Sequence, residues 1–313
     1  MAKTNTDSTT LRHWIIVAAS CALGIGCVVL GLAGLRSVIA SQYAANGRSP
    51  RVVLVNRPAW MSQAVADEII DTARVVGVHS VFDQDILIQT AKKLSAEPWI
   101  KSVRQVRRCF DQAPGDTLEV DCEYRVPTAL VKWDNYYWLV DADGFKLPEQ
   151  YSARQAHKLV AGSGNNLTIR IIQGVTHPPV QSGTLWPGDD LAAGLEVAKL
   201  LTGKPFAGQL PIVDVSNFDG RRDPDAAHIV LVTTYGTSVR WGRAPSAKDY
   251  FVEVPTSQKL QCLSDIFQQM HRVDGGQPWI DIRFDQVTYP NPVPAAQEQP
   301  PTPQPTASTS DNP

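Results

Sequence analysis

An uncharged apolar run near the N-terminus constrains this chain more than any other feature. It extends from Trp14 to Leu35. As a helix it would be about 33 Å long, enough to cross a hydrocarbon layer of about 30 Å. A cleavable signal peptide ending near Val38-Ile39-Ala40 is the alternative, but signal cores usually have only about 7–15 apolar residues. The sequence therefore predicts a membrane-spanning helix over residues 14–39, after a tail at 1–13.

The charges that flank this helix do not decide its orientation. Basic residues lie on both sides of it: Lys3, Arg12, Arg36, Arg48 and Arg51. The positive-inside rule therefore gives no answer, but long downstream domains are translocated largely regardless of charge. We accordingly expect a single-pass protein of the cell inner membrane, with the N-terminus in the cytoplasm and residues 41–313 outside.

Small side chains recur along one side of the predicted helix. They follow steps of three and four residues: Ser20, Gly24, Cys27, Gly31 and Gly34. Such a seam lets a second membrane helix approach closely. Glycine is also frequent in membrane helices generally, so both a partner helix and ordinary composition explain the pattern.

Composition argues against several classes of function. A net charge of −2 gives no field that would attract nucleic acid. Outside the apolar run there are three cysteines, Cys109, Cys122 and Cys262, without Cys-x-x-Cys spacing. This predicts neither a disulfide framework nor a structural zinc site. A bridge between Cys109 and Cys122 would have to cross a hairpin, and their spacing around its turn is offset.

Downstream of the helix, the chain begins with a linker and a small α+β unit. Residues 40–50 are small and polar, as in a tether. Alternation and helical spacing then predict strand, helix, helix, strand and strand at 51–56, 59–75, 83–97, 102–110 and 117–124. Asp83 is the expected N-cap of the second helix. This order makes residues 51–125 one domain.

Strands dominate the second unit, residues 126–289, and two helices accompany them. The predicted strands are 128–132, 136–140, 167–172, 211–215, 228–234, 237–241 and 279–289, and the helices are 189–201 and 258–271. Residues 149–166 show no decisive pattern. The tail, residues 290–313, has eight prolines and two charges. Such a tail cannot bury apolar surface, and it serves either as a disordered spacer or as a ligand for a partner.

No motif for catalysis, cofactor binding or metal binding is present. The carboxylate-rich segment Asp219–Asp225 could hold calcium, but its two arginines and the lack of a downstream glutamate favour a plain turn. Asp189 and Asp190 could form an acid–base pair, but neighbours at a helix start do not face each other. We therefore predict no enzyme, no cofactor and no small-molecule substrate.

Basic side chains gather in and after the first sheet. They are Arg104, Arg107, Arg108, Arg125 and Lys132. Contact with anionic lipid headgroups near the membrane is one interpretation. A solvated strand face is the other.

An ordered set of motifs resembles a known family. It comprises Leu94-Ser-Ala-Glu-Pro-Trp-Ile100, Val103, Asp116-Thr-Leu-Glu-Val120, Glu123-Tyr124 and Pro127-Thr-Ala129, extended by Trp133 and Leu139-Val-Asp141. The second unit adds Gly174, Val239-Arg-Trp-Gly242 and Trp279-Ile-Asp-Ile-Arg283. Over residues 51–289 the chain resembles the bacterial division proteins FtsQ and DivIB. In that family a single membrane helix precedes a POTRA domain of β-α-α-β-β order and then a β domain.

The resemblance implies a non-enzymatic scaffold at the division septum. Members bind the bitopic proteins FtsB and FtsL (DivIC in Gram-positives) and help to regulate septal peptidoglycan synthesis by FtsW and FtsI, which are further candidate partners. The partner adds a strand to the exposed edge of the last β-domain strand, which offers free N–H and C=O groups. Here that edge corresponds to Arg283, Phe284, Asp285, Gln286, Val287, Thr288 and Tyr289.

The chain departs from the family pattern at several places. Cys109-Phe110 stands where a Trp-Pro is expected, and Pro290 ends the last strand early. Two other classes are therefore retained: a POTRA-bearing module that assists secretion or envelope assembly, and a membrane-anchored hydrolase. The first normally precedes a membrane β-barrel, for which residues after 145 leave no room. The second needs a nucleophile–base or metal constellation.

Overall fold

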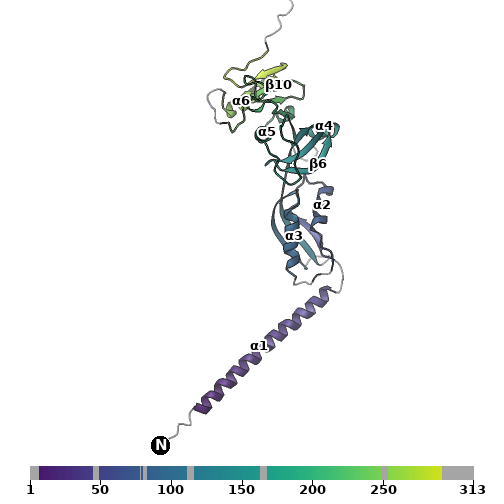
Figure 1. The fold of residues 1–313 in the computed structure, drawn as a ribbon, viewed down its shortest axis with the longest axis vertical. Coiled ribbons are helices and arrows are strands. Elements are labelled where there is room, and N and C mark those ends of the chain that lie inside the picture. The colour runs from purple at the N-terminus through teal and green to yellow at the C-terminus, as the bar shows by residue number, and fades with distance from the viewer. Residues whose placement is uncertain are drawn as a thin grey trace, which may run out of the picture.

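A computed structural model describes residues 7–44, 49–77, 79, 83–110, 116–162, 168–247 and 253–290. Over these ranges the protein is of mixed α+β type, with one long N-terminal helix and two β-sheets (Figure 1). Most of the predicted tail, residues 163–167 and parts of the predicted cytoplasmic tail and linker lie outside the described residues.

The N-terminal helix α1 extends over Asp7–Ala44. Within it, His13–Ile39 is long and apolar enough to cross a membrane, with a mean hydropathy of 2.5 and none of its most apolar window buried in the protein. Trp14, for example, is 74% exposed. The helix could therefore span a bilayer, as predicted, and a hydrocarbon environment would cover the apolar surface that the protein leaves open.

The first unit is a three-stranded sheet with two helices, in the predicted order of elements. The sheet order is β1-β3-β2, with β1 parallel to β3 and β2 antiparallel to it. Bounds are Arg51–Val55 for β1, Gln63–Ala73 for α2, Asp85–Ser95 for α3, Ile100–Cys109 for β2 and Thr117–Tyr124 for β3. The side chain of Ser62 accepts a hydrogen bond from the Val65 N–H and so begins α2.

The second unit is an eight-stranded sheet of order β11-β10-β9-β8-β7-β4-β5-β6. Its strands are β4 Pro127–Trp133, β5 Tyr136–Asp141, β6 Lys146–Ser152, β7 Arg170–Gln173, β8 Ile212–Asp214, β9 Ile229–Val232, β10 Ser238–Gly242 and β11 Trp279–Asp281. The central strands β4, β7 and β8 are parallel neighbours. Their carboxyl ends therefore meet at one edge of the sheet.

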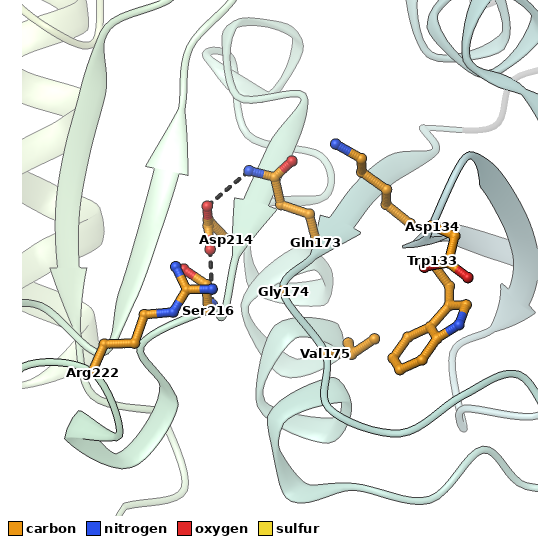
Figure 2. A pocket seen from close by; sticks show the side chains of 9 residues that line it. Trp133, Asp134, Gln173, Gly174, Val175, Asp214, Ser216 and Arg222 are labelled. Atoms are coloured by element: carbon orange, nitrogen blue, oxygen red, sulfur yellow. Dashed lines mark hydrogen bonds between the residues drawn. The ribbon is translucent and has the colours of Figure 1, made fainter.

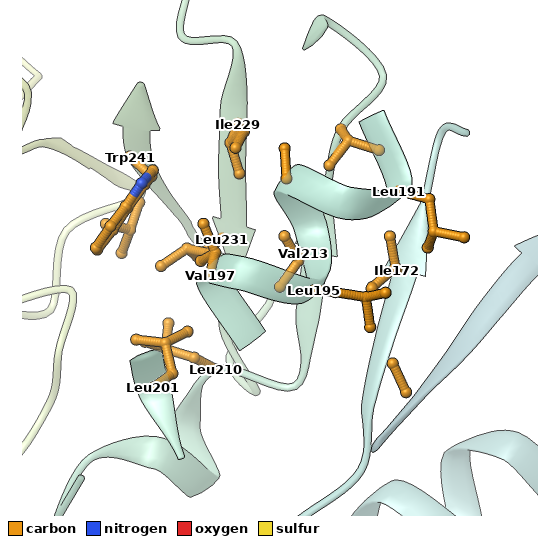
Figure 3. Packing of buried hydrophobic residues seen from close by; sticks show 14 of the residues in the cluster. Ile172, Leu191, Leu195, Val197, Leu201, Leu210, Val213, Ile229, Leu231 and Trp241 are labelled. Atoms are coloured by element: carbon orange, nitrogen blue, oxygen red, sulfur yellow. The ribbon is translucent and has the colours of Figure 1, made fainter. Parts of the chain in front are cut away.

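Helices cover both faces of this sheet. They are α4 Ala153–Ala161, α5 Asp189–Leu201 and α6 Thr256–Met270, with short 3₁₀ turns at Ala207–Gln209 and Phe218–Gly220. Figure 3 shows α5 laid across the strands, with Leu195 and Val197 packed among Ile172, Val213 and Leu231. Alternate residues of the same strands point the other way, toward α4 and the first unit.

The two units share a hydrophobic core. One cluster of buried side chains includes Leu118 and Trp99 from the first unit together with Leu130, Leu139 and Ile171 from the large sheet. The predicted boundary at residues 125 and 126 is thus a change of sheet. Apolar packing continues across it.

Three predictions about elements need correction. The N-cap of α3 is Gln84 and not Asp83, although Asp83 Oδ1 accepts a hydrogen bond from the Asp85 N–H at 3.1 Å. The predicted strand at 279–289 ends at Asp281, because the chain then bends and returns toward β11. The stretch 149–166, which showed no pattern, contains the end of β6 and helix α4. At the start of α4, the side-chain Oε1 of Gln155 accepts a hydrogen bond from the Ser152 N–H at 2.9 Å. A capping pair of this kind was the signal that could have revealed the helix.

Candidate functional site

The segment predicted to receive a partner strand folds back on the edge of the large sheet. β11 pairs with β10 on one side only. On its other side the Asp281 N–H donates to the Thr288 C=O at 2.9 Å, and the Thr288 N–H donates to the Asp281 C=O at 3.1 Å. One bridge of the chain's own backbone therefore covers the outer edge of β11.

Arg283 stabilises the segment that folds back from Asp281 to Thr288. Its guanidinium donates to the carboxylate of Asp281, with Nη2 at 2.9 Å, and Nη1 reaches the Asp225 C=O at 3.0 Å. The hydrogen bond to Asp281 raises the pKa of Arg283, so the group stays charged. The Arg283 C=O accepts from the Val254 N–H at 2.8 Å. Arg283 therefore shapes the loop, and its carbonyl is already engaged.

Part of the predicted edge still faces outward. In an antiparallel bridge the residues on either side of the paired one direct their N–H and C=O groups away from the partner. Here those residues are Val287 and Tyr289, beside the paired Thr288. Phe284 and Tyr289 are each 43% exposed, while Asp285 accepts a hydrogen bond from the Gln258 side chain at 3.3 Å. The accessible edge is thus shorter than the predicted Arg283–Tyr289 and centres on residues 287–289.

A polar cavity lies elsewhere on the same sheet, at the carboxyl ends of β4, β7 and β8. Its volume is about 370 Å³. Figure 2 shows Arg222 beside Asp214 and Ser216 on one side and Trp133 on the other, with Gly174 between them. In sheets with parallel strands, the crevice at the carboxyl ends is the usual place for a ligand.

The strand register sets polar side chains in a row along this edge. Val131 pairs with Ile172, and Gln173 pairs with Asp214, so Lys132 follows on the same side as Gln173. Gln173 Nε2 donates to Asp214 Oδ2 at 2.7 Å, and the Ser216 N–H donates to Asp214 Oδ1 at 2.8 Å. Both oxygens of Asp214 are therefore engaged.

Two cations line the cavity without a partner. Lys132 and Arg222 are both exposed. Within the described ranges, neither side chain makes a hydrogen bond or an ion pair. Their charges are thus available to a ligand.

Gly174 holds the ends of β7 and β8 close together. Its φ is +86°, and a Cβ at this position would lie 2.5 Å from the Ser216 nitrogen. Only glycine fits such a conformation and such an approach. Gly174 therefore meets a backbone constraint beside the cavity.

The sequence did not bring the residues of this cavity together as one site, although Lys132 belongs to the basic cluster and Arg222 to the segment Asp219–Asp225. A signal was present, because strand 167–172, helix 189–201 and strand 211–215 follow one another in the predicted order. That order is typical of a right-handed βαβ unit with parallel strands. The position of β4 beside β7 is a tertiary feature that the local pattern does not contain.

The arginine cluster is neutralised by carboxylates. Arg107 Nε lies 2.5 Å from Glu119 Oε2, and Arg108 Nη2 lies 2.5 Å from Asp116 Oδ2. Arg125 pairs with Asp141 at 2.7 Å and stacks on the Phe145 ring. Arg104 is within 4.0 Å of Glu123. The four arginines therefore form a ladder of ion pairs, which weakens the interpretation as a lipid-headgroup contact, whereas Lys132 of the same basic cluster makes no ion pair within the described ranges.

The small-residue seam of α1 is open along its length. A Cβ placed on Gly24, Gly31 or Gly34 would meet nothing within 4 Å. Ser20 Oγ donates to the Val17 C=O of its own helix at 2.9 Å, and Cys27 is an exposed free thiol. The seam thus has room for a second helix, and that partner remains a prediction.

Asp190 and the turn Asp219–Asp225, which were considered for acid–base and metal chemistry, have structural roles. Burial raises the pKa of Asp190, but hydrogen bonds from Arg221 and Thr176 outweigh it and keep the pKa below its usual value. Asp223 Oδ1 accepts from the Asp225 N–H at 3.0 Å, within the turn itself. No group of three His, Cys, Asp or Glu side chains suited to a metal ion occurs among the residues that the structure describes. Within the described ranges, Cys21, Cys27, Cys122 and Cys262 are free thiols.

Compared with models of known protein families and with the sequences of curated proteins, the chain matches none of them.

Proposed function

We propose that this chain is a membrane-anchored scaffold of the bacterial division complex, similar in role to FtsQ and DivIB. The observation that supports this best is the order of parts along the chain. An apolar helix precedes a β-α-α-β-β unit, and a larger sheet with an exposed edge follows. In the proposal the first unit is a POTRA domain and the second is the β domain of the family.

In the proposal, the chain recognises single-span partners of the FtsB and FtsL (DivIC) type. Each partner supplies a strand that extends the large sheet. FtsW and FtsI would be reached through these partners. The free edge at Val287 and Tyr289 is the place for that strand, because Thr288 already pairs with Asp281. Backbone hydrogen bonds would supply affinity, and the exposed rings of Phe284 and Tyr289 would add apolar contact.

Affinity capture of the full chain from membranes of dividing cells tests this proposal. Proline at both Val287 and Tyr289 removes two N–H groups from the edge. We expect FtsB- and FtsL-type proteins to be captured by the wild type and reduced at least tenfold with V287P/Y289P. The matched V287A/Y289F variant keeps the backbone donors and the aromatic ring at position 289 and should retain most of the capture.

Equal capture by the proline pair and the wild type would exclude strand addition at this edge. The proposal also assigns the chain no reaction of its own. Turnover of peptidoglycan or its lipid-linked precursor by the purified full chain would therefore contradict it.

A further inference from the structure

The cavity at the carboxyl ends of β4, β7 and β8 has the features of a second recognition site. It lies at the centre of the eight-stranded sheet, whereas the edge used in the proposed function is at residues 287–289, outside β11. The strands β9, β10 and β11 separate β8 from that edge. A ligand in the cavity and a partner strand at residues 287–289 could therefore bind independently.

The cavity carries two cations, Lys132 and Arg222, and two carboxylates, Asp134 and Asp214. The cations can receive an anionic group, because no described residue engages their side chains. Asp214 keeps its charge, but both of its oxygens already accept hydrogen bonds, from Gln173 and the Ser216 N–H. Charge-assisted hydrogen bonds from such unpaired cations are among the stronger polar contacts available to a ligand.

The remaining lining matches a peptide. Trp133 and Val175 give the cavity an apolar wall, and Figure 2 places them together, away from Arg222. The Asp134 carboxylate, at the turn after β4, can accept from a peptide N–H. The apolar wall, the Asp134 acceptor and the two cations together suit a peptide segment in which apolar and acidic side chains lie close together.

We propose that this cavity binds a short acidic peptide segment of another protein. Carboxylates of that segment contact Lys132 and Arg222, and an apolar side chain beside them packs on Trp133. The inference does not depend on the division role, because it rests on the cavity alone.

Titration of a fluorescently labelled peptide with the full chain in detergent micelles tests this. The probe is a ten-residue peptide of alternating Leu and Asp, and its Leu/Asn counterpart is the uncharged control. We expect the acidic peptide to bind at least tenfold more tightly than the Leu/Asn peptide. The K132Q/R222Q variant should lose at least tenfold in affinity for the acidic peptide, and W133L should weaken both peptides.

A matched variant separates local contacts from net charge. Lys92 and Lys204 are exposed lysines outside the cavity, and K92Q/K204Q changes the net charge by the same amount as K132Q/R222Q. It should bind the acidic peptide as the wild type does. The proposal is overturned if neither peptide binds, if both bind equally, or if K132Q/R222Q retains wild-type affinity. Displacement of the peptide by millimolar inorganic phosphate would likewise overturn it, in favour of a general anion site.

Discussion

Arg170 is a fully buried cation whose partners are carbonyl and hydroxyl oxygens. Its side chain donates to the Leu210 C=O at 3.2 Å, to the Ala198 C=O at 3.1 Å and to Thr202 Oγ1 at 3.3 Å. Burial lowers its pKa to about 10. The guanidinium closes the C-terminal end of α5, where the helix dipole favours positive charge. The sequence shows an arginine at the start of a strand, and nothing local distinguishes it from the exposed Lys132 on β4.

Replacement of Arg170 by methionine should destabilise the fold. R170M keeps most of the volume but leaves the Leu210 C=O buried without its donor and removes one of the two donors to the Ala198 C=O, at a cost of about 2 kcal/mol. We expect a clearly lower melting temperature by circular dichroism of the full chain in micelles. The exposed Arg154 of α4 supplies the control R154M, which should melt like the wild type. Identical melting of R170M and R154M would refute this role.

At the scale of elements, prediction succeeds where a local pattern decides and fails where the tertiary fold decides. Helix α5 was predicted at its observed bounds, because its acidic start and apolar face are both local. The strand predicted at 279–289 was too long, since alternation cannot reveal that Thr288 returns to Asp281. α4 was missed although a capping pair begins it, because its nine residues are too few for a clear period.

The cap of α4 can be tested directly. In Q155A the Ser152 N–H loses its side-chain acceptor, and we expect a loss of about 0.5–1 kcal/mol in unfolding free energy. Gln261 of α6 is a matched exposed glutamine that pairs with Asp265 four residues later. Q261A should therefore cost only about 0.2–0.5 kcal/mol. Thermal unfolding of both variants measures the difference, and a Q155A loss no greater than that of Q261A would argue against the cap.

At the scale of the whole molecule, the parts follow one another along its long axis. Figure 1 shows α1 at one end, the unit of α2 and α3 next, and the large sheet beyond it. The order of these parts can be predicted from the sequence, because an uncharged apolar run is followed by segments with helical spacing and then by segments with strand alternation. The core shared between the units does not, because contacts such as those of Trp99 near Leu139 join residues far apart in the chain.

This arrangement gives the division proposal its physical content. An apolar helix would hold the chain at the membrane, and the two units would present a sheet edge and a polar cavity beyond it. Neither surface requires the chain to make or break a covalent bond. In the proposal, such a scaffold acts by holding its partners at the division site.

The most direct test of this account is the position of a full-length fluorescent fusion in dividing cells of the source organism. The account predicts a band at the division site that appears before constriction is complete. A fusion of residues 1–44 alone, which keeps α1 and lacks both folded units, should instead outline the whole membrane. An even membrane signal from the full-length fusion, indistinguishable from that of residues 1–44, would contradict the account.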